Sequence, residues 1–218
     1  MRASSIVAIA ACAALTCGIA SPLRAQSAAI SGLTGTSEVS SRWTWGWEFT
    51  VGSYDIQVTH LGTWDNAGNG LRVDHYMGIW LPGASPTLLV STVIPSGTAA
   101  TLENGFRWVQ LATPIVLSAN ITYRIGDEPA GSGTEDYEQM LNIPASNLTM
   151  HPAITYGGRV TNQADEFSYP SILVADLARI GPNFKFQPAN VIPEPSLIQL
   201  PLLLGFGGGA LWWRRRRG

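Results

Sequence analysis

The sequence has very little cysteine and only one lysine. Its 218 residues include two cysteines, Cys12 and Cys17, both near the N-terminus, and the single lysine is Lys185. If the N-terminal segment is removed on export, the remaining protein has no disulfide, no thiolate nucleophile and no cysteine ligand for a metal ion. Its stability must then come from non-covalent packing.

Charged residues are also scarce, at 13% of the chain. Between Gln26 and Pro193 there are seven basic and fourteen acidic residues, which gives this body a net charge of −7. We therefore exclude nucleic acid as a partner, because phosphate groups bind to basic surfaces. The body holds most of the tryptophans and many β-branched residues, so it is not a disordered acidic tail, and its length fits one domain.

The motifs of common hydrolases are missing. Neither Gly-x-Ser-x-Gly nor His-Glu-x-x-His occurs, and the three histidines, His60, His75 and His151, are scattered. We expect His75, at the start of an apolar strand, to be a hydrogen-bonded structural residue rather than a metal ligand. The chain is predicted not to be an enzyme. A glycoside-acting enzyme stays an alternative, because fourteen acidic residues make some carboxylate pair inevitable.

Helical periodicity is nearly absent, and short β-type segments dominate from Trp43 onward. These segments are separated by Gly, Pro, Asn and Asp at spacings of about ten residues, which is typical of an antiparallel β-sandwich. The strands that we predict are Trp45–Val51, Ile56–Leu61, His75–Leu81, Leu88–Ile94, Phe106–Leu111, Ile115–Leu117 and Ile121–Ile125.

The pattern weakens after Gly126. Residues Glu135–Leu141 fit either a single helical turn or an excursion between strands. Weaker strand candidates are Ala153–Tyr156, Ser171–Leu173 and Asn183–Phe186. We assign residues 43–187 to the β-sandwich domain, residues 26–42, rich in Ser, Gly and Thr, to a flexible leader, and residues 188–196 to a proline-rich linker.

Residues 1–25 have the three parts of a secretory signal peptide. Arg2 supplies the positive charge, Ile6–Ile19 is apolar, and cleavage is predicted after Ala25. The apolar part is shorter than the ~20 residues that a membrane-spanning helix requires. We therefore predict export, with the Sec translocon and signal peptidase as partners.

A second apolar segment, Leu197–Trp213, is followed by four arginines, Arg214, Arg215, Arg216 and Arg217. Seventeen helical residues extend about 25 Å, enough for a thin span. The arginines should remain cytoplasmic by the positive-inside rule. Residues 197–218 are thus predicted as a single transmembrane helix that tethers the body to the inner membrane from the periplasmic side.

The whole C-terminus, residues 191–218, resembles the PEP-CTERM sorting signal of Gram-negative bacteria. The triplet Pro193-Glu194-Pro195, the apolar segment and the basic cluster follow one another in the order of that signal. The resemblance implies recognition by an exosortase, a membrane-embedded cysteine protease-transpeptidase. Cleavage near the triplet would then send the protein to the cell exterior, often in species that produce polysaccharide. Flanking prolines favour an extended chain that a protease can engage.

The body resembles a bacterial extracellular domain of unknown function that often precedes such tails. The resemblance covers about residues 47–186 and implies a jelly-roll-like sandwich, with no activity attached. The matching segments are 49–52 (FTVG), 61–65 (LGTWD), 75–80 (HYMGIW), 93–98 (VIPSGT), 105–109 (GFRWV), 121–126 (ITYRIG) and 181–184 (GPNF).

Aromatic residues alternate along one predicted strand. Trp43, Trp45, Trp47 and Phe49 would all lie on one face, because successive strand residues point to opposite faces. A buried face would make them a wall of the core. An exposed face would make Trp43, Trp45 and Trp47 a stacking platform for sugar rings, with Trp43 the most exposed.

An acidic cluster is the only candidate metal site in the sequence. Extracellular β-sandwiches often bind calcium through loop carboxylates, and a solvated acidic loop is the alternative. The five candidate ligands are Asp127, Glu128, Glu135, Asp136 and Glu138.

The sequence as a whole predicts an exported, exosortase-sorted protein of the cell surface or extracellular matrix, with a non-catalytic β-sandwich and no cofactor. Association with exopolysaccharide in a biofilm fits this localisation. One alternative is a carbohydrate-binding module that uses exposed aromatic residues. The other is a calcium-dependent or glycoside-acting enzyme.

Overall fold

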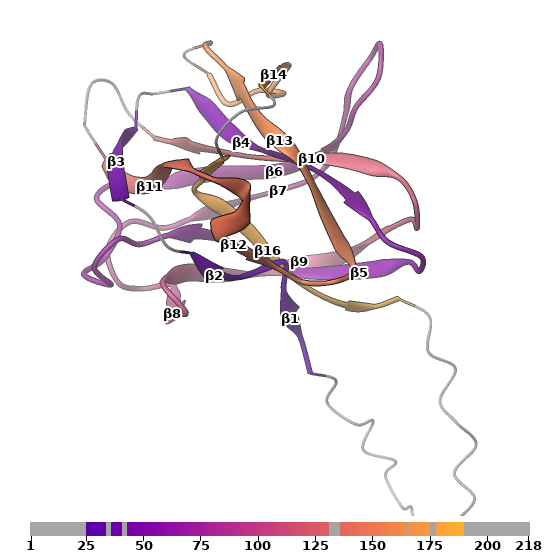
Figure 1. The fold of residues 1–218 in the computed structure, drawn as a ribbon. Helices are drawn as coiled ribbons and strands as arrows, with labels where there is room; N and C mark the ends of the chain where they lie inside the picture. The colour runs from indigo at the N-terminus through magenta and orange to yellow at the C-terminus, as the bar shows by residue number, and fades with distance from the viewer. Residues whose placement is uncertain are drawn as a thin grey trace, which may run out of the picture.

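The computed structural model of the protein describes residues 25–33, 36–40, 43–130, 136–164, 166–174 and 178–189. Among these residues the one helical element is a short 3-10 turn, η1 (Ala145–Asn147), and the other elements are β-strands. All the strand pairs are antiparallel, and the two larger sheets lie one over the other (Figure 1). The prediction of an all-β fold with packed antiparallel sheets is therefore confirmed.

The larger sheet has six strands in the order β14-β13-β4-β10-β6-β7. Its central strands, β4 and β10, are eight residues long and are flanked by β13 and β6, so they are hydrogen-bonded on both sides. The strands of this sheet are β4 (Thr44–Val51), β6 (His75–Leu81), β7 (Thr87–Ile94), β10 (Thr122–Pro129), β13 (Ile154–Asn162) and β14 (Ile172–Val174).

The second sheet has five strands in the order β1-β16-β5-β9-β8. They are β1 (Ser27–Ala28), β5 (Ile56–Trp64), β8 (Thr101–Glu103), β9 (Phe106–Leu117) and β16 (Pro182–Pro188). Two small sheets accompany it, in the orders β15-β11-β3 and β12-β2. Their strands are β2 (Ile30–Leu33), β3 (Thr36–Ser40), β11 (Asp136–Ile143), β12 (Leu148–Met150) and β15 (Ala178–Ile180).

Every predicted strand overlaps an observed one, although several observed strands extend further, as β10 does to Pro129 and β13 to Asn162. Two of the predicted strands are parts of the same strand, β9. The predicted break at Pro114 is a bulge within β9. Val58 pairs with Ile115 while His60 pairs with Gln110, so residues 111–114 lie opposite a single residue of β5. Proline has no backbone N–H to donate, which is why it is accommodated in a bulge.

The prediction of a flexible leader over residues 26–42 is wrong. This segment contains β1, β2 and β3, and Ile30 at its centre is fully buried. The side chain of Asn183 holds Ile30 by both backbone groups: Ile30 N donates to Asn183 Oδ1 at 3.1 Å, and Asn183 Nδ2 donates to Ile30 O at 2.9 Å. The folded domain thus begins at β1, sixteen residues before the predicted boundary at Trp43.

The acidic segment Glu135–Leu141 is described from Asp136 onward, and there it is a strand rather than a helical turn. It forms β11, which pairs with β3 on one side and with β15 on the other. The second interpretation, an excursion between the main strands, comes closer to this arrangement.

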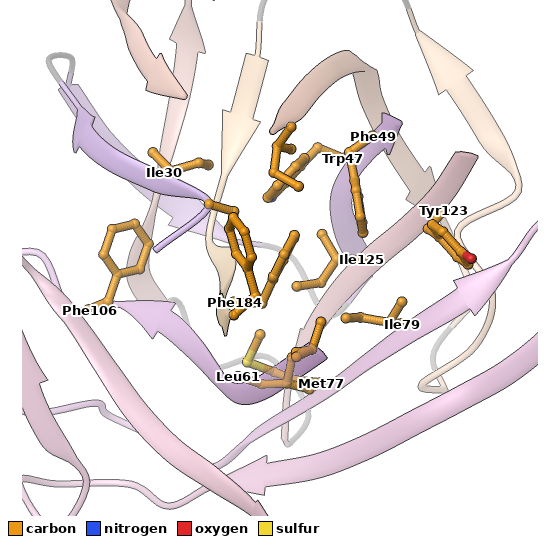
Figure 2. Packing of buried hydrophobic residues seen from close by; sticks show 14 of the residues in the cluster. Ile30, Trp47, Phe49, Leu61, Met77, Ile79, Phe106, Tyr123, Ile125 and Phe184 are labelled. Atoms are coloured by element: carbon orange, nitrogen blue, oxygen red, sulfur yellow. The ribbon is translucent and has the colours of Figure 1, made fainter. Parts of the chain in front are cut away.

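The core lies between the inner faces of the two main sheets (Figure 2). Trp47 and Phe49 of β4 are fully buried there, and the Trp47 ring stacks on Phe184 of β16 with 5.8 Å between ring centroids. The indole Nε1 of Trp47 donates to Pro182 O at 2.8 Å, so its polar atom is satisfied in the core. Leu61 and Ile125 extend the same cluster along the two sheets.

The two ends of the described domain lie side by side. Ser27 of β1 pairs with Phe186 of β16, and Ala189 N donates to Asp55 O at 2.9 Å just beyond that strand. In Figure 1, β1 and the end of β16 leave the body on the same side. Segments that precede residue 25 and follow residue 189 are therefore attached at one side of the domain.

Candidate functional site

Of the three tryptophans for which a wall of the core and a sugar platform were the alternatives, two belong to the interior. Trp45 and Trp47 are buried, and the guanidinium of Arg179 covers the Trp45 ring at 3.3 Å from its centroid. Trp43 is half-buried, with its ring centroid 5.4 Å from that of Trp45. The alternation predicted from the sequence is present, and it makes this face a wall of the core.

The carboxylate of Asp127 lies in a sealed polar cluster between the sheets. Thr63 Oγ1 donates to Asp127 Oδ2 at 2.5 Å, and His75 Nδ1 lies 2.8 Å from Asp127 Oδ1. All three side chains are fully buried. A histidine paired with an aspartate is the arrangement of a general base, but a base must reach its substrate, and this pair lies inside the core. His75 therefore has the structural, hydrogen-bonded role that we expected.

Glu128, the next residue, lies on the opposite face of β10. Thr44 Oγ1 donates to its Oε2 at 2.8 Å, and Ser168 N donates to Thr44 Oγ1 at 3.2 Å. Because neighbouring strand residues point to opposite faces, Asp127 and Glu128 do not face a common ion.

The other predicted calcium ligands stay untested. Glu135 lies outside the described residues, as do the side chains of Asp136 and Glu138 in β11. Among the side chains that are described, no group of three or more His, Cys, Asp or Glu residues is arranged to hold a metal ion.

The outer face of the six-stranded sheet carries a feature that the sequence analysis missed. Gly46, Gly126 and Gly78 lie next to one another on β4, β10 and β6, which leaves a row without side chains across three strands. The Trp80 ring covers two of these glycines: a Cβ on Gly126 would lie 3.1 Å from it, and one on Gly78 would lie 3.0 Å from it. A flat aromatic ring can lie this close to a sheet only where the residues below it lack side chains.

Residues 166–171, in the connection between β13 and β14, cover Trp80 and add two further rings. Phe167 lies 5.2 Å from Trp80 and 6.1 Å from Tyr76, and Tyr169 lies 6.4 Å from Trp80, all measured between ring centroids. Trp80 is buried, Phe167 and Tyr169 are half-buried, and Tyr76 is 41% exposed. We call the set Tyr76, Trp80, Phe167 and Tyr169 the aromatic row.

An ion pair fixes one end of the aromatic row. Arg124 Nε donates to Glu48 Oε2 at 2.8 Å, and its Nη1 donates to Pro170 O at 2.8 Å and to Ser171 O at 3.0 Å. The guanidinium also lies 5.2 Å from the centroid of the Tyr169 ring. Burial raises the pKa of the Tyr169 hydroxyl, and the positive charge of Arg124 opposes this in part. The Tyr169 end of the aromatic row is thus held by an ion pair and by two hydrogen bonds to backbone carbonyls.

One signal in the sequence points to this surface. Along 75–81 (HYMGIWL), Tyr76, Gly78 and Trp80 occupy alternate positions, so the pattern places two aromatic rings and a glycine on one face. The contribution of Phe167 and Tyr169 has no such signal, because it depends on where their irregular segment folds back.

A shallow, open cavity of about 390 Å³ lies near Pro188, at the end of β16. It is lined by Ser53, Tyr54, Asp55, Ala119 and Pro188. Its one carboxylate is already engaged, because Asp55 Oδ1 accepts a hydrogen bond from Ala119 N at 2.8 Å. This cavity has no pair of acidic groups that would point to catalysis.

The sorting residues Pro193, Glu194 and Pro195, the apolar segment 197–213 and the arginines 214–217 lie outside the described residues, as do residues 1–24. Ala25, the predicted cleavage position, is exposed and lies two residues before the start of β1. In the described parts of the chain no helix has the length and apolar character needed to cross a bilayer.

Comparison with known proteins leaves the function open. No protein-family model matches the chain, and the curated proteins include none with significant similarity to it. The function is therefore inferred from the residues and their geometry alone.

Proposed function

We propose that the chain is an exported protein of the cell surface or extracellular matrix, sorted by an exosortase, and that its β-sandwich is non-catalytic. The observation that carries the proposal is the order of three features at the C-terminus: the triplet Pro193-Glu194-Pro195, the apolar segment 197–213 and the arginines 214–217. The body would be held on the periplasmic side of the inner membrane before processing. It would then reach the cell surface or a polysaccharide matrix.

Two properties of the body support this proposal. Its ends lie side by side at Ser27 and Phe186, so the signal peptide and the tail would leave from one side of the domain, as a tethered body requires. Long strands that follow one another in the sequence often change sheets, as from β4 to β5, β5 to β6, β7 to β9 and β9 to β10. This alternation supports a jelly-roll-like topology for the sandwich.

Mass spectrometry of the protein from its native host tests the sorting proposal. We expect an N-terminus at Gln26 and a C-terminus near residues 193–195 in the exported fraction. Replacing the triplet by Ala-Ala-Ala should leave the protein uncut in the membrane fraction. The matched control is Pro152→Ala, which changes an exposed proline outside the tail. An exported protein that still contains residues 214–218 would refute removal of the tail.

Binding of polysaccharide is a second candidate function, and the aromatic row favours it. Tyr76 and Phe167 present partly exposed rings next to one another, and sugar rings stack on aromatic faces of this kind. The site differs from the one predicted at Trp43, Trp45 and Trp47, because two of those rings are buried.

The test is affinity electrophoresis of the exported protein in gels that contain the exopolysaccharide of the host. We expect retardation that Tyr76→Ala and Phe167→Ala each reduce. Tyr54→Ala is the matched control, because Tyr54 is an equally exposed tyrosine outside the row, 41% accessible like Tyr76. Equal mobility with and without polysaccharide would exclude this function and leave the sorting proposal intact.

A further inference from the structure

Strand β7 is a long edge strand. It is the last strand of the six-stranded sheet and pairs with β6 on one side. The other side of an edge strand presents backbone N–H and C=O groups that can form hydrogen bonds with a strand from another molecule. Within its eight residues, TLLVSTVI, there is no charged residue, no proline and no glycine.

The other edges of the two main sheets are less suited to pairing. Strand β14 has three residues, β1 has two, and β8 has three, of which Glu103 carries a charge. Short strands and charged residues are the usual protection of sheet edges against association. Strand β7 has neither protection, although Pro86 and Pro95 directly flank it and limit any pairing to its own length.

The outer face of β7 is apolar near both of its ends. Leu88 is 45% exposed and Val93 is 42% exposed, and in the β6–β7 register they lie opposite Trp80 and Tyr76. Ser91 lies between them, opposite Gly78. Leu88 and Val93 share a face despite their odd separation, because a register shift next to Leu88 places one extra residue in β7.

We propose that two copies of this chain dimerise by antiparallel pairing of β7 with β7. A two-fold axis at Ser91 brings the two Ser91 side chains together and places Val90 of each copy opposite Thr92 of the other. The extra residue near Leu88 then lets Leu88 of each copy meet Val93 of the other. The pairing joins the two six-stranded sheets into one continuous sheet.

A second copy fits this edge better than an unrelated strand, for two reasons. The apolar residues are arranged symmetrically about Ser91, so the strand is complementary to itself in the antiparallel direction. The body carries a net charge of −7, so two copies repel each other over most surfaces, but β7 adds no charge to the contact. A two-fold contact is closed, and the short or charged remaining edges do not extend it into a fibre.

Cysteine cross-linking tests the register in the full chain with Cys12 and Cys17 replaced by alanine. Ser91→Cys lies at the axis and should give a disulfide-linked dimer on a non-reducing gel. Val93→Cys alone should not form this dimer. Each Val93 lies two residues from the axis, so the two thiols would be about 13 Å apart, beyond the reach of a disulfide. An equimolar mixture of Leu88→Cys and Val93→Cys chains should cross-link again.

Charge substitution at the axis tests the association itself. The contact is small, so we expect dimers by sedimentation equilibrium at about 100 µM protein rather than at nanomolar concentration. Ser91→Lys and Ser91→Glu should each be monomeric, because like charges lie directly opposite each other, and mixing the two variants should restore a dimer. Ile121→Lys, which changes an exposed apolar residue outside β7, should remain dimeric.

Two results would overturn the proposal. One is a full chain that stays monomeric at this concentration and forms no Ser91→Cys dimer. The other is cross-linking by Leu88→Cys alone as strongly as by the mixture, which indicates non-specific aggregation. Restoration by mixing the two charged variants requires folded chains, so it separates a lost contact from a lost fold.

Discussion

The carboxylate of Asp127 in one sheet accepts a hydrogen bond from the hydroxyl of Thr63 in the other sheet at 2.5 Å. Both groups are fully buried, and His75 Nδ1 lies 2.8 Å from the other oxygen of the same carboxylate. A buried carboxylate must have hydrogen-bond partners, since its desolvation is costly without them. Asp127 therefore connects the two layers of the sandwich at a point where the core is polar.

Substitutions at Thr63 and at Asp127 should lower the free energy of unfolding by different amounts. Thr63→Val keeps the shape but removes one donor, and leaving a buried acceptor with one partner fewer should lower the free energy of unfolding by about 1–3 kcal/mol. Asp127→Ala removes one hydrogen-bond partner each from Thr63 and His75 and opens a gap, so we expect a loss of about 3–5 kcal/mol. Urea unfolding measures both values. Glu166→Ala, at an exposed acid, should change stability by less than about 0.5 kcal/mol.

Gly46, at the β4 end of the row of glycines, should tolerate no side chain. A Cβ at Gly46 would overlap the carbonyl oxygen of Ile125, a backbone atom that cannot rotate away. We expect Gly46→Ala to cost about 1–3 kcal/mol, as overpacking of a core does. Gly83→Ala is the control, because a Cβ there would meet no atom closer than 3.9 Å. A thermal melt of Gly46→Ala equal to that of the wild type would contradict the close approach of β4 and β10.

The side chain of Asn183 should be needed to hold the N-terminal strands. Its amide bonds the N–H and the C=O of Ile30, in the way that a neighbouring strand would. Asn183→Ala removes both bonds in a buried site, so we expect a loss of about 2–4 kcal/mol and faster hydrogen exchange across β2. Gln187→Ala, farther along β16 and half-buried, is the control and should have a smaller effect. Unchanged exchange at Ile30 would show that β2 is held by other contacts.

The part of the fold that could be predicted is the part with a regular local pattern. Trp45–Val51 and His75–Leu81 are rich in aromatic and β-branched residues and are bounded by turn residues, so their strands coincide almost fully with β4 and β6. Ile30–Leu33 has no such pattern. It is a strand because Asn183 and β12 supply partners from more than one hundred residues away, and local composition carries no information about them.

The candidate sites, too, could be predicted only where a local pattern determines them. The aromatic alternation of Trp45, Trp47 and Phe49 is correct, but whether the face is open or buried depends on the second sheet that packs on it. Adjacent acids in the sequence, Asp127 and Glu128, suggested a shared ion, yet strand geometry sends them to opposite faces. The aromatic row needs Phe167 to fold back over Trp80, which no local pattern encodes.

The stability of the protein should depend on pH through His60. Burial lowers the pKa of His60 below its ordinary value of 6.5, and the positive charge of Lys185, its pairing partner on β16, lowers it further, while Glu103 opposes this. The folded state therefore binds a proton at this site less readily than the unfolded state. The stabilising effect of a neutral His60 is complete above pH 6.5 and is lost as the pH falls from there toward the lower pKa of the folded state.

Chemical shifts of the His60 ring, followed by NMR across this pH range, should give a midpoint below 6.5. Lys185→Met removes the neighbouring positive charge and keeps a chain of similar length, so it should move the midpoint upward. In His60→Gln the free energy of unfolding should fall less between pH 7 and pH 5 than in the wild type, because glutamine does not titrate. A His60 midpoint above 6.5, or one that Lys185→Met leaves in place, would mean that burial and Lys185 do not act on this imidazole as the structure indicates.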